Sequence, residues 1–218
     1  MQTGEAVTVV QGEDELLART AHLFAQADEI SCAANDLGTW VVTHQPEVAD
    51  AAARSRRDDV RLRKVFRPGV LLDPVAARGL ARAREEHGAH VRITTEEVNE
   101  TILFDRRLAV LAGDVRAGRR SYGVVTQPEA VEGVASLFEA VWRSAVDVDV
   151  FDARIAEIRA IAPQVLDLLG QGIKDETAAR AMGMGVRTYR RRVAELMDAL
   201  GAGSRFQAGV RARELGLV

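Results

Sequence analysis

The spacing of apolar residues changes near Phe151, and this change constrains the fold more than any other feature of the sequence. Before Phe151, short apolar runs typical of strands alternate with stretches of helical periodicity, which favours a layered α/β architecture over a helix bundle. After Phe151 only helical spacing remains. We therefore expect an α/β domain over residues 1–148, a connector helix over residues 149–160 and an all-α domain over residues 161–218.

The N-terminal part alternates strand-like and helical segments, and their order predicts a mixed sheet. A polar turn is expected at residues 114–120. Strands are expected at residues 7–10, 30–34, 60–66, 91–94, 102–104, 108–112 and 122–126. Helices are expected at residues 14–27, 46–57, 74–87 and from Pro128 onward. The last of these helices has an apolar stripe that predicts core packing and no cofactor site, formed by Val131, Val134, Phe138, Val141, Trp142 and Ala145.

The C-terminal part predicts short helices joined by glycine-rich turns. Pro163 is expected in the first turn of a helix, because a proline deeper inside a helix costs about 3 kcal/mol. The turns contain the glycines of residues 170–172, 183–185 and 201–203. The helices that follow these turns are expected at residues 175–182, 186–200 and 205–215. This succession of helices and turns outlines a helix-turn-helix module.

The formal net charge of −3 hides an asymmetry between the two parts. Residues 151–218 contain 11 Arg and Lys against 8 Asp and Glu, a net charge of +3, whereas residues 1–150 contain 18 against 24, a net charge of −6. The positive charge is concentrated between Val186 and Arg213, where seven basic residues stand against two acids. A basic segment attached to an otherwise acidic chain indicates a nucleic-acid-binding domain joined to another domain.

Composition excludes several other classes of protein. The apolar and charged contents, 47% and 28%, are those of a globular chain rather than a disordered or collagen-like one. The sequence lacks an apolar run of the roughly 18 to 20 residues that a membrane span requires, and it begins without the pattern of a secretory signal. The single cysteine, Cys32, can form no internal disulfide. We expect a cytoplasmic protein that does not bind membranes.

Residues 161–218 also carry a pattern at fixed spacing. It includes the run from Val165 to Ile173, the pair Ala178-Ala179, and the closing sequence Leu200-Gly201-Ala202-Gly203-Ser204-Arg205-Phe206-Gln207-Ala208. This pattern resembles the LuxR-type DNA-binding domain of bacterial transcription regulators. The resemblance implies that the helix over residues 186–200 enters the major groove of duplex DNA. The chain departs from the family at Thr177, Gly185, Tyr189 and Arg192, and none of these changes removes the DNA-facing surface.

The helix over residues 186–200 can also be interpreted without the resemblance. At about 100° per residue, its inward side carries Tyr189, Val193, Leu196, Met197 and Leu200. The opposite side of its N-terminal half carries Arg187, Arg190, Arg191 and Ala194. An arginine there can donate two hydrogen bonds to a guanine or bind a phosphate. A solvated arginine face is the alternative.

The resemblance to the LuxR-type family implies roles for individual residues. It implies base-reading positions at Arg190, Arg191 and Ala194. It implies phosphate contacts at Arg187, Thr188 and Arg192. Lys174 and Arg205 stand beside helix N-termini and are candidate phosphate anchors, or simply solvated charges.

A second pattern lies near the end of the N-terminal part, where Val98-Asn99-Glu100 precedes an apolar run that contains Asp105. With the order of strands and helices over residues 5–147, it resembles the phospholipase-D-like effector module of TrmB-like regulators. Catalytic relatives need His-x-Lys-x4-Asp, in which the His is the nucleophile and the Lys holds phosphate. Here Val98 and Glu100 replace the His and the Lys. We therefore expect no phosphodiester chemistry and no catalytic residue, and Asp105 is expected to be a turn or structural acid.

Two alternative interpretations stand beside this one. A response regulator with a degenerate receiver domain is one, because a receiver also precedes LuxR-type tails; however, Gln11 and Gly12 stand where its adjacent acids belong. A phosphodiesterase-like enzyme with an appended helical domain is the other. Two observations argue against it: a glycine-rich phosphate loop is missing, and no metal-ligand spacing is found around His22, His44, His87 and His90.

The sequence therefore predicts a bacterial transcription regulator with an α/β domain for effector sensing or dimerisation. Its expected partners are duplex DNA and a second copy of the chain, because symmetric half-sites multiply specificity. No cofactor and no metal are expected. Open α/β sheets bind ligands where loops leave the strand ends. The loops at that end give a candidate pocket for a small-molecule effector, formed by Asn35, Asp36, Trp40, Phe66, Arg67, Glu97 and Asn99.

Overall fold

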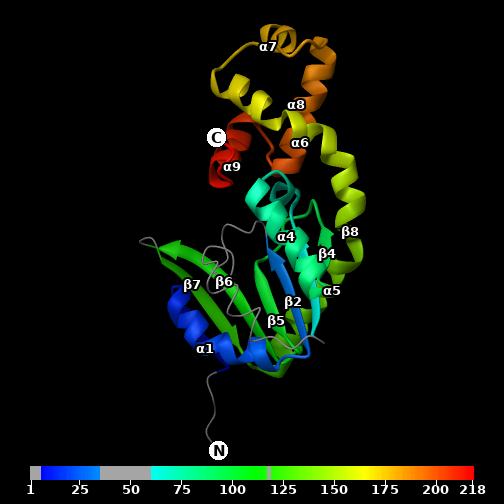
Figure 1. Ribbon diagram of the computed structural model, residues 1–218. Helices are drawn as coiled ribbons and strands as arrows, with labels where there is room; N and C mark the ends of the chain where they lie inside the picture. Colours follow the sequence, from blue (N-terminus) through cyan, green and yellow to red (C-terminus); the bar gives the residue numbers. More distant parts are fainter. Residues whose placement is uncertain (1–5, 35–59, 117–118) are drawn as a thin grey trace, which may run out of the picture.

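The computed structural model describes residues 6–34, 60–116 and 119–218. It contains an α/β part, which ends at Asp147, and a helical part that follows it and is stacked on one end of the first (Figure 1). The helix expected at residues 46–57 lies outside the described residues. None of the helices in the described ranges is long and apolar enough to span a membrane.

One sheet of eight strands is found in the described part of the chain, in the order β1-β7-β6-β5-β2-β3-β4-β8. β2, β3 and β4 run parallel to one another, and the other neighbouring pairs are antiparallel. The expected mixed sheet is confirmed, and the all-parallel sheet of a receiver domain is excluded. The strands are β1 (Val7–Gln11), β2 (Glu29–Ala34), β3 (Arg61–Phe66), β4 (His90–Ile93), β5 (Thr101–Phe104), β6 (Leu108–Arg116), β7 (Arg119–Val125) and β8 (Val146–Asp147).

Two apolar cores lie on the two faces of this sheet. The helices that cover it are α1 (Glu13–Gln26), α4 (Pro74–His87) and α5 (Pro128–Ser144). Ile30 and Phe66 belong to the core that α1 and α4 cover, whereas Ala33 and Val65 belong to the core under α5. Because side chains alternate across a strand, consecutive apolar residues of β2 and β3 serve both cores.

The hairpin between β6 and β7 is longer than the sequence predicts. The polar turn expected at residues 114–120 is mostly strand, because the backbone pairing of β6 and β7 continues into the exposed tip. The pairing is irregular between Ala112 and Val115, where a Cβ added to Gly113 would lie 2.5 Å from Ser121 Oγ. Glycine at such a bulge lets the two strands approach closely.

The helical part has no strand in residues 148–218. It consists of α6 (Val148–Gly170), α7 (Asp175–Ala181), α8 (Val186–Leu200) and α9 (Arg205–Glu214). The last three agree with the expected helices to within one residue at each end. The apolar core on the α1 and α4 side continues into this part and includes Ile158 of α6 and Leu196 of α8.

The helix break expected at Pro163 is wrong, because α6 runs through the proline. Figure 1 shows that α6 is bent, which is the usual result of a proline that removes one hydrogen bond inside a helix. Burial of Ile158, Val165 and Leu166 on the same helix offsets the proline's cost of about 3 kcal/mol. α6 thus crosses the domain boundary expected at residue 161, and that boundary stays a prediction.

Two short elements carry no signal in the sequence. β8 pairs two residues with the end of β4, and so short a strand has no periodicity. The other is the 3-10 helix η1 (Pro68–Leu71), which is buried and packs against α8. Phe66, two residues before η1, is 1% exposed. Its ring is part of the core, and its expected place in an effector pocket stays a prediction.

Candidate nucleic-acid interface

α7 and α8 are joined by a tight turn that depends on glycine. Gly183 adopts a φ of +66°, a conformation that L side chains rarely adopt. The N–H of Met184 donates to the carbonyl of Ala179 at 2.9 Å and closes the turn. Ala178 and Ala179 are buried, and their small side chains let α7 lie close to α8. This turn sets the direction in which α8 leaves α7.

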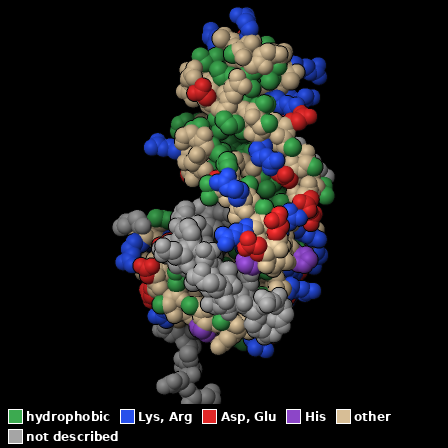
Figure 2. All heavy atoms as spheres, in the orientation of Figure 1, with side chains coloured by type: hydrophobic (Ala, Val, Ile, Leu, Met, Phe, Trp, Pro, Cys, Tyr) green, Lys and Arg blue, Asp and Glu red, His purple; other side chains and the backbone are tan. Residues whose placement is uncertain are grey.

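α8 has one buried face and one exposed face, as its spacing predicts. The buried residues are Tyr189, Val193, Leu196, Ala199 and Leu200, whereas Met197, also expected inward, is only partly buried. The exposed residues of the N-terminal half are Arg187, Arg190, Arg191 and Ala194. Figure 2 shows Lys and Arg side chains gathered around the end of the molecule that α7 and α8 form.

Asp175, in the first turn of α7, contacts two of the expected DNA-binding arginines. Its carboxylate accepts a hydrogen bond from Arg190 Nε at 2.8 Å and lies 2.8 Å from Arg205 Nη1. The Asp175 side chain is 11% exposed, and the hydrogen bonds from Arg205 and Arg190 lower the pKa of its carboxyl group. Glu176 lies 3.2 Å from Arg190 Nη2. The start of α7 therefore orients Arg190.

Neither acid is among the site residues expected from the sequence. Asp175 and Glu176 occupy the first turn of a helix, where acidic residues are common because they interact favourably with the helix dipole. Because the helix dipole already explains these two acids, the sequence gives no reason to expect that they also contact Arg190. Only the turn between α7 and α8 brings them to Arg190, 15 and 14 residues further along the chain.

Arg192 and Arg191 are held differently from Arg190. Arg192 is 20% exposed and pairs with Glu157 of α6 as well as with Glu195 on its own helix. It therefore ties α8 to α6. Arg191 is 64% exposed, and its Nε lies 3.6 Å from Glu195. Arg191 is thus the more accessible of the two to a ligand.

The other expected DNA contacts lie on the same end of the helical part. Arg187 and Lys174 are exposed and have no ion pair in the part of the chain that the structure describes. Ala194 is exposed and Thr188 is half-buried. The contacts of all these residues with DNA stay predictions.

α9 begins with a capping arrangement that places Arg205. Ser204 Oγ accepts a hydrogen bond from the N–H of Gln207 at 3.1 Å, and Gln207 Oε1 accepts one from the N–H of Gly203 at 2.8 Å. This arrangement resembles a capping box, in which the residues at the two ends of the first turn support each other. Arg205 is the first residue of α9, so the cap holds it at the distance from Asp175 given above.

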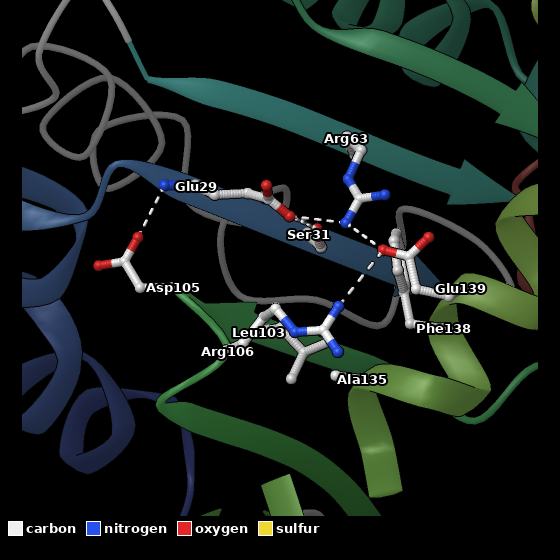
Figure 3. A pocket seen from close by; sticks show the side chains of 9 residues that line it. All are labelled: Glu29, Ser31, Arg63, Leu103, Asp105, Arg106, Ala135, Phe138 and Glu139. Carbon is white, nitrogen blue, oxygen red and sulfur yellow. Dashed lines mark hydrogen bonds and ion pairs between the residues drawn. The ribbon is translucent and has the colours of Figure 1, made fainter. Parts of the chain in front are cut away.

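A cluster of charged side chains lies between the sheet and α5 (Figure 3). Arg63 of β3 donates to Glu29 of β2 at 2.6 Å and to Glu139 of α5 at 2.7 Å. Arg106 lies 3.8 Å from Glu139, and the hydrogen bond from Arg63 lowers the pKa of the Glu139 carboxyl group. The Arg63 guanidinium also lies over the Phe138 ring, 5.0 Å from its centre. These contacts join α5 to the sheet.

The positions of the incomplete phospholipase-D pattern are structural. Asp105 lies at φ +50° in the turn between β5 and β6 and accepts hydrogen bonds, each 2.8 Å long, from two backbone N–H groups at the start of β2. Its expected structural role is confirmed. Val98 is buried in the core under α5, and Glu100 is 6% exposed and pairs with Arg120. These two positions present no nucleophile and no phosphate-binding cation.

The expected effector residues are brought together only in part. Asn35, Asp36 and Trp40 lie outside the described residues. A hollow of about 330 Å³ is lined by Arg67, Glu97, Val98, Asn99 and Arg211. The sequence does not predict the contribution of Arg211, because the spacing of α9 says nothing about its closeness to the end of the sheet.

Comparison with known proteins identifies one related sequence and several structures with a similar fold. The sequence matches no model of a protein family. It is 34% identical over 134 residues to the bialaphos biosynthetic pathway regulatory protein of Streptomyces hygroscopicus, and the match covers 60% of this chain and 52% of that protein. This chain thus spans about half the length of the curated relative that it matches.

Two solved structures are similar to parts of this one. Nuc from Salmonella typhimurium, a phospholipase D family member, matches with a TM-score of 0.50 and 13% identity over 65% of this chain and 97% of Nuc. This likeness shows a phospholipase-D-like α/β fold. TrmBL2, an archaeal chromatin protein, matches with a TM-score of 0.49 and 18% identity over 68% of this chain and 56% of that one.

Proposed function

We propose that this chain is a bacterial DNA-binding transcription regulator that acts in the cytoplasm and reads duplex DNA with α8 in the LuxR-type manner. The observation that carries the proposal is the exposed N-terminal half of α8, where Arg187, Arg190 and Arg191 all face away from the core. The name of the relative, a biosynthetic pathway regulatory protein, supports a regulatory role. The net charge of +3 over residues 151–218 supports attraction to a phosphate backbone.

The residues of this interface have different tasks in the proposal. Arg190 and Arg191 contact base edges, because a guanidinium can donate two hydrogen bonds to O6 and N7 of a guanine. Ala194 contacts a base through its methyl group. Phosphates are bound by Lys174, Arg187, Thr188, Arg192 and Arg205.

A second copy of the chain is the proposed protein partner. Phe206 and Val210, 83% and 43% exposed, stand on one face of α9 because they are four residues apart. Burial of this face between two copies gives the paired DNA-binding modules that a symmetric site requires. Phe206→Glu is expected to shift the protein from dimer to monomer in analytical ultracentrifugation. A wild-type protein that stays monomeric at all concentrations rules out this dimer.

The α/β part acts as a regulatory domain rather than as an enzyme in this proposal. Its support is the loss of both chemical groups at Val98 and Glu100, together with the structural use of Asp105. A domain with this fold and no catalytic groups remains able to bind an effector at the end of its sheet.

The test is a salt-titrated binding assay with selected DNA and a scrambled control. Arg190→Ala or Arg191→Ala is expected to cost about 1–3 kcal/mol on selected DNA and to flatten the preference at one base position. Arg187→Ala is expected to weaken binding to both DNAs equally and to reduce the salt slope by about one unit. Arg116→Ala, at the 89% exposed tip of β6, is the control and should bind like wild type.

The same assay can contradict the proposal. If all three α8 variants bind selected DNA as tightly as wild type, α8 does not contact DNA. The arginines then form a solvated face. Circular dichroism should show that each variant is folded, because these side chains point away from the buried face of α8.

A further inference from the structure

Two hollows lie between the α/β part and the helical part, and Arg67 lines both of them. Arg67 lines the hollow of about 330 Å³ described above and also a second hollow of about 430 Å³. Both volumes lie within the range of small-molecule pockets, about 300–1,000 Å³. The second hollow is lined by Arg67, Thr95, Asp198, Gly201, Ala202 and Gly203. The two hollows together are named the Arg67 groove below.

The guanidinium of Arg67 makes no hydrogen bond or ion pair in the part of the chain that the structure describes. It packs against Gly201, where φ is +63° and where an added Cβ would overlap the guanidinium nitrogens. Its Nε is buried and has no hydrogen-bond acceptor among the described residues. A guanidinium carries five N–H donors, and buried donors are normally satisfied. The groove thus contains a cation that lacks a matching acceptor.

We propose that the Arg67 groove binds a small polar molecule through a carboxylate or phosphate group. The planar guanidinium matches either group with two parallel hydrogen bonds. Arg211 adds a second positive charge, although it also pairs with Glu214 at 2.9 Å. Glu97 and Asp198 accept hydrogen bonds from hydroxyl or amino groups of the same molecule. The two acids disfavour a bare polyanion.

The groove is placed to act on α8. Arg67 lies at the C-terminal end of α8, and η1 follows Arg67 directly in the chain. η1 packs against α8, and a Cβ added to Gly69 in η1 would lie 3.0 Å from Leu215 Cδ1. An oxyanion that draws Arg67 away from Gly201 therefore changes how η1 supports α8. This regulatory step rests on the proposed DNA-binding function, whereas binding of the small molecule does not.

The binding test follows the Nε–Hε resonance of Arg67 in the full chain by NMR. This resonance is identified by its absence from the Arg67→Lys variant. The probes are glycerate, glycerol 3-phosphate and glycerol, which share hydroxyl groups and differ in the anionic group. We expect a saturable shift of this resonance with glycerate or with glycerol 3-phosphate, and no shift with glycerol. The probe that gives the saturable shift shows whether the groove binds a carboxylate or a phosphate. Equal and unsaturable shifts at Arg67 and Arg116 would overturn the proposal.

The matched variants test whether Arg67 holds the anion. Arg67→Lys keeps the charge and loses the planar fork, so the dissociation constant, measured for wild type and variants by isothermal titration calorimetry, is expected to rise about tenfold or more. Arg116→Lys, on the exposed hairpin, should leave it unchanged. Thermal unfolding checks that both variants are folded. An Arg67→Lys variant that binds the probe like wild type shows that Arg67 is not the ligand and overturns the assignment.

The regulatory step is tested with DNA at constant ionic strength. The probe that binds is expected to change the DNA affinity of the wild-type protein and not that of Arg67→Lys. If the probe binds and the DNA affinity of wild type is unchanged, the coupling to α8 is wrong and the binding site stands. If no DNA is bound under any condition, the proposed function fails, and the NMR result still decides the groove.

Discussion

Arg190 Nε lies 2.8 Å from Asp175 Oδ2, so an arginine expected to contact a base is already hydrogen-bonded to an acid of the preceding helix. Asp175 contacts Arg205 too, and Glu176 lies beside the same Arg190 guanidinium. The pair of Glu176 with Arg190 is exposed on both sides, and exposed ion pairs contribute about 0–1 kcal/mol each. On the proposed function, DNA therefore has to compete with Asp175 and Glu176 for Arg190, and it displaces the exposed Glu176 more readily.

Removing the charge of Glu176 should tighten DNA binding. Glu176→Gln removes a competitor for Arg190 and a negative charge near the DNA, so we expect the affinity to rise about two- to fivefold. Fluorescence anisotropy with labelled DNA measures this change. Glu86→Gln, which alters an exposed ion pair on α4, is the matched control and should bind like wild type. An unchanged affinity in Glu176→Gln would show that this pair does not compete with DNA.

Asp175 should make the stability of the folded chain depend on pH. Arg205 and Arg190 hold the pKa of its carboxyl group below the value in the unfolded chain. The stabilisation from a lowered pKa is complete above the unfolded pKa, about 4, and is lost as pH falls through the folded pKa. We expect Asp175→Asn to be less stable than wild type at pH 7, and the difference to shrink below pH 4. Urea unfolding over this range measures it, and a difference independent of pH contradicts it.

Gly201→Ala should destabilise the protein for two separable reasons. A φ of +63° is unfavourable for alanine, and the added Cβ overlaps the Arg67 guanidinium, so a loss of about 1–3 kcal/mol is expected. Gly88→Ala is the control, because φ is equally unfavourable there at +62° but no atom lies within 4 Å of the added Cβ. It should lower the free energy of unfolding by less than Gly201→Ala does. A double-mutant cycle with Arg67→Ala, measured by urea unfolding, should give a coupling of about 0.5 kcal/mol or more. Strict additivity would mean that Arg67 does not pack on Gly201 in solution.

Cys32 should react slowly with thiol reagents in the folded protein. Burial raises the pKa of its thiol to about 11, and nearby Glu100 adds to the effect while Lys64 opposes it. Because the thiolate is the nucleophile, alkylation by iodoacetamide at pH 8 is expected to be about a hundredfold slower than in urea. Mass spectrometry over time measures both rates. Similar rates in the two conditions would show that the site is open to solvent and reagent.

The α/β part should not hydrolyse phosphodiesters. Val98 offers no nucleophile, and the Glu100 carboxylate repels a substrate phosphate rather than stabilising it. Purified protein without added metal is expected to give no turnover of bis(p-nitrophenyl) phosphate above the buffer rate. Turnover that disappears in Asp105→Ala would refute this expectation.

Elements with local signals could be predicted from the sequence. Pro74 and Pro128 each occupy the first position of a helix, and Gly88 and Gly201 end helices in the left-handed conformation that glycine tolerates. The inward face of α8 follows from helical periodicity alone. These signals depend only on residues that are close in sequence. For this reason the expected bounds of these helices agree closely with the bounds in the structure.

Features that depend on distant partners could not be predicted. The break expected at Pro163 follows a local rule, but burial of Val165 and Leu166 against the rest of the core overrides it. The pairing of Asp175 with Arg190 requires the turn between two helices, and the placement of Arg211 and Glu97 in the lining of one hollow requires the whole fold. Periodicity assigns residues to a face of an element, and it does not say which other element covers that face.

The continuous core that joins the two parts has a consequence for how such proteins are inherited. Phe66 of the sheet, Ile158 of α6 and Leu196 of α8 belong to one apolar cluster, and η1 packs against α8. A tail exchanged by recombination for one with a different surface would leave η1 exposed to water. The α/β part and the helical part must therefore diverge together, and exchange between lineages is expected to carry both parts as one unit.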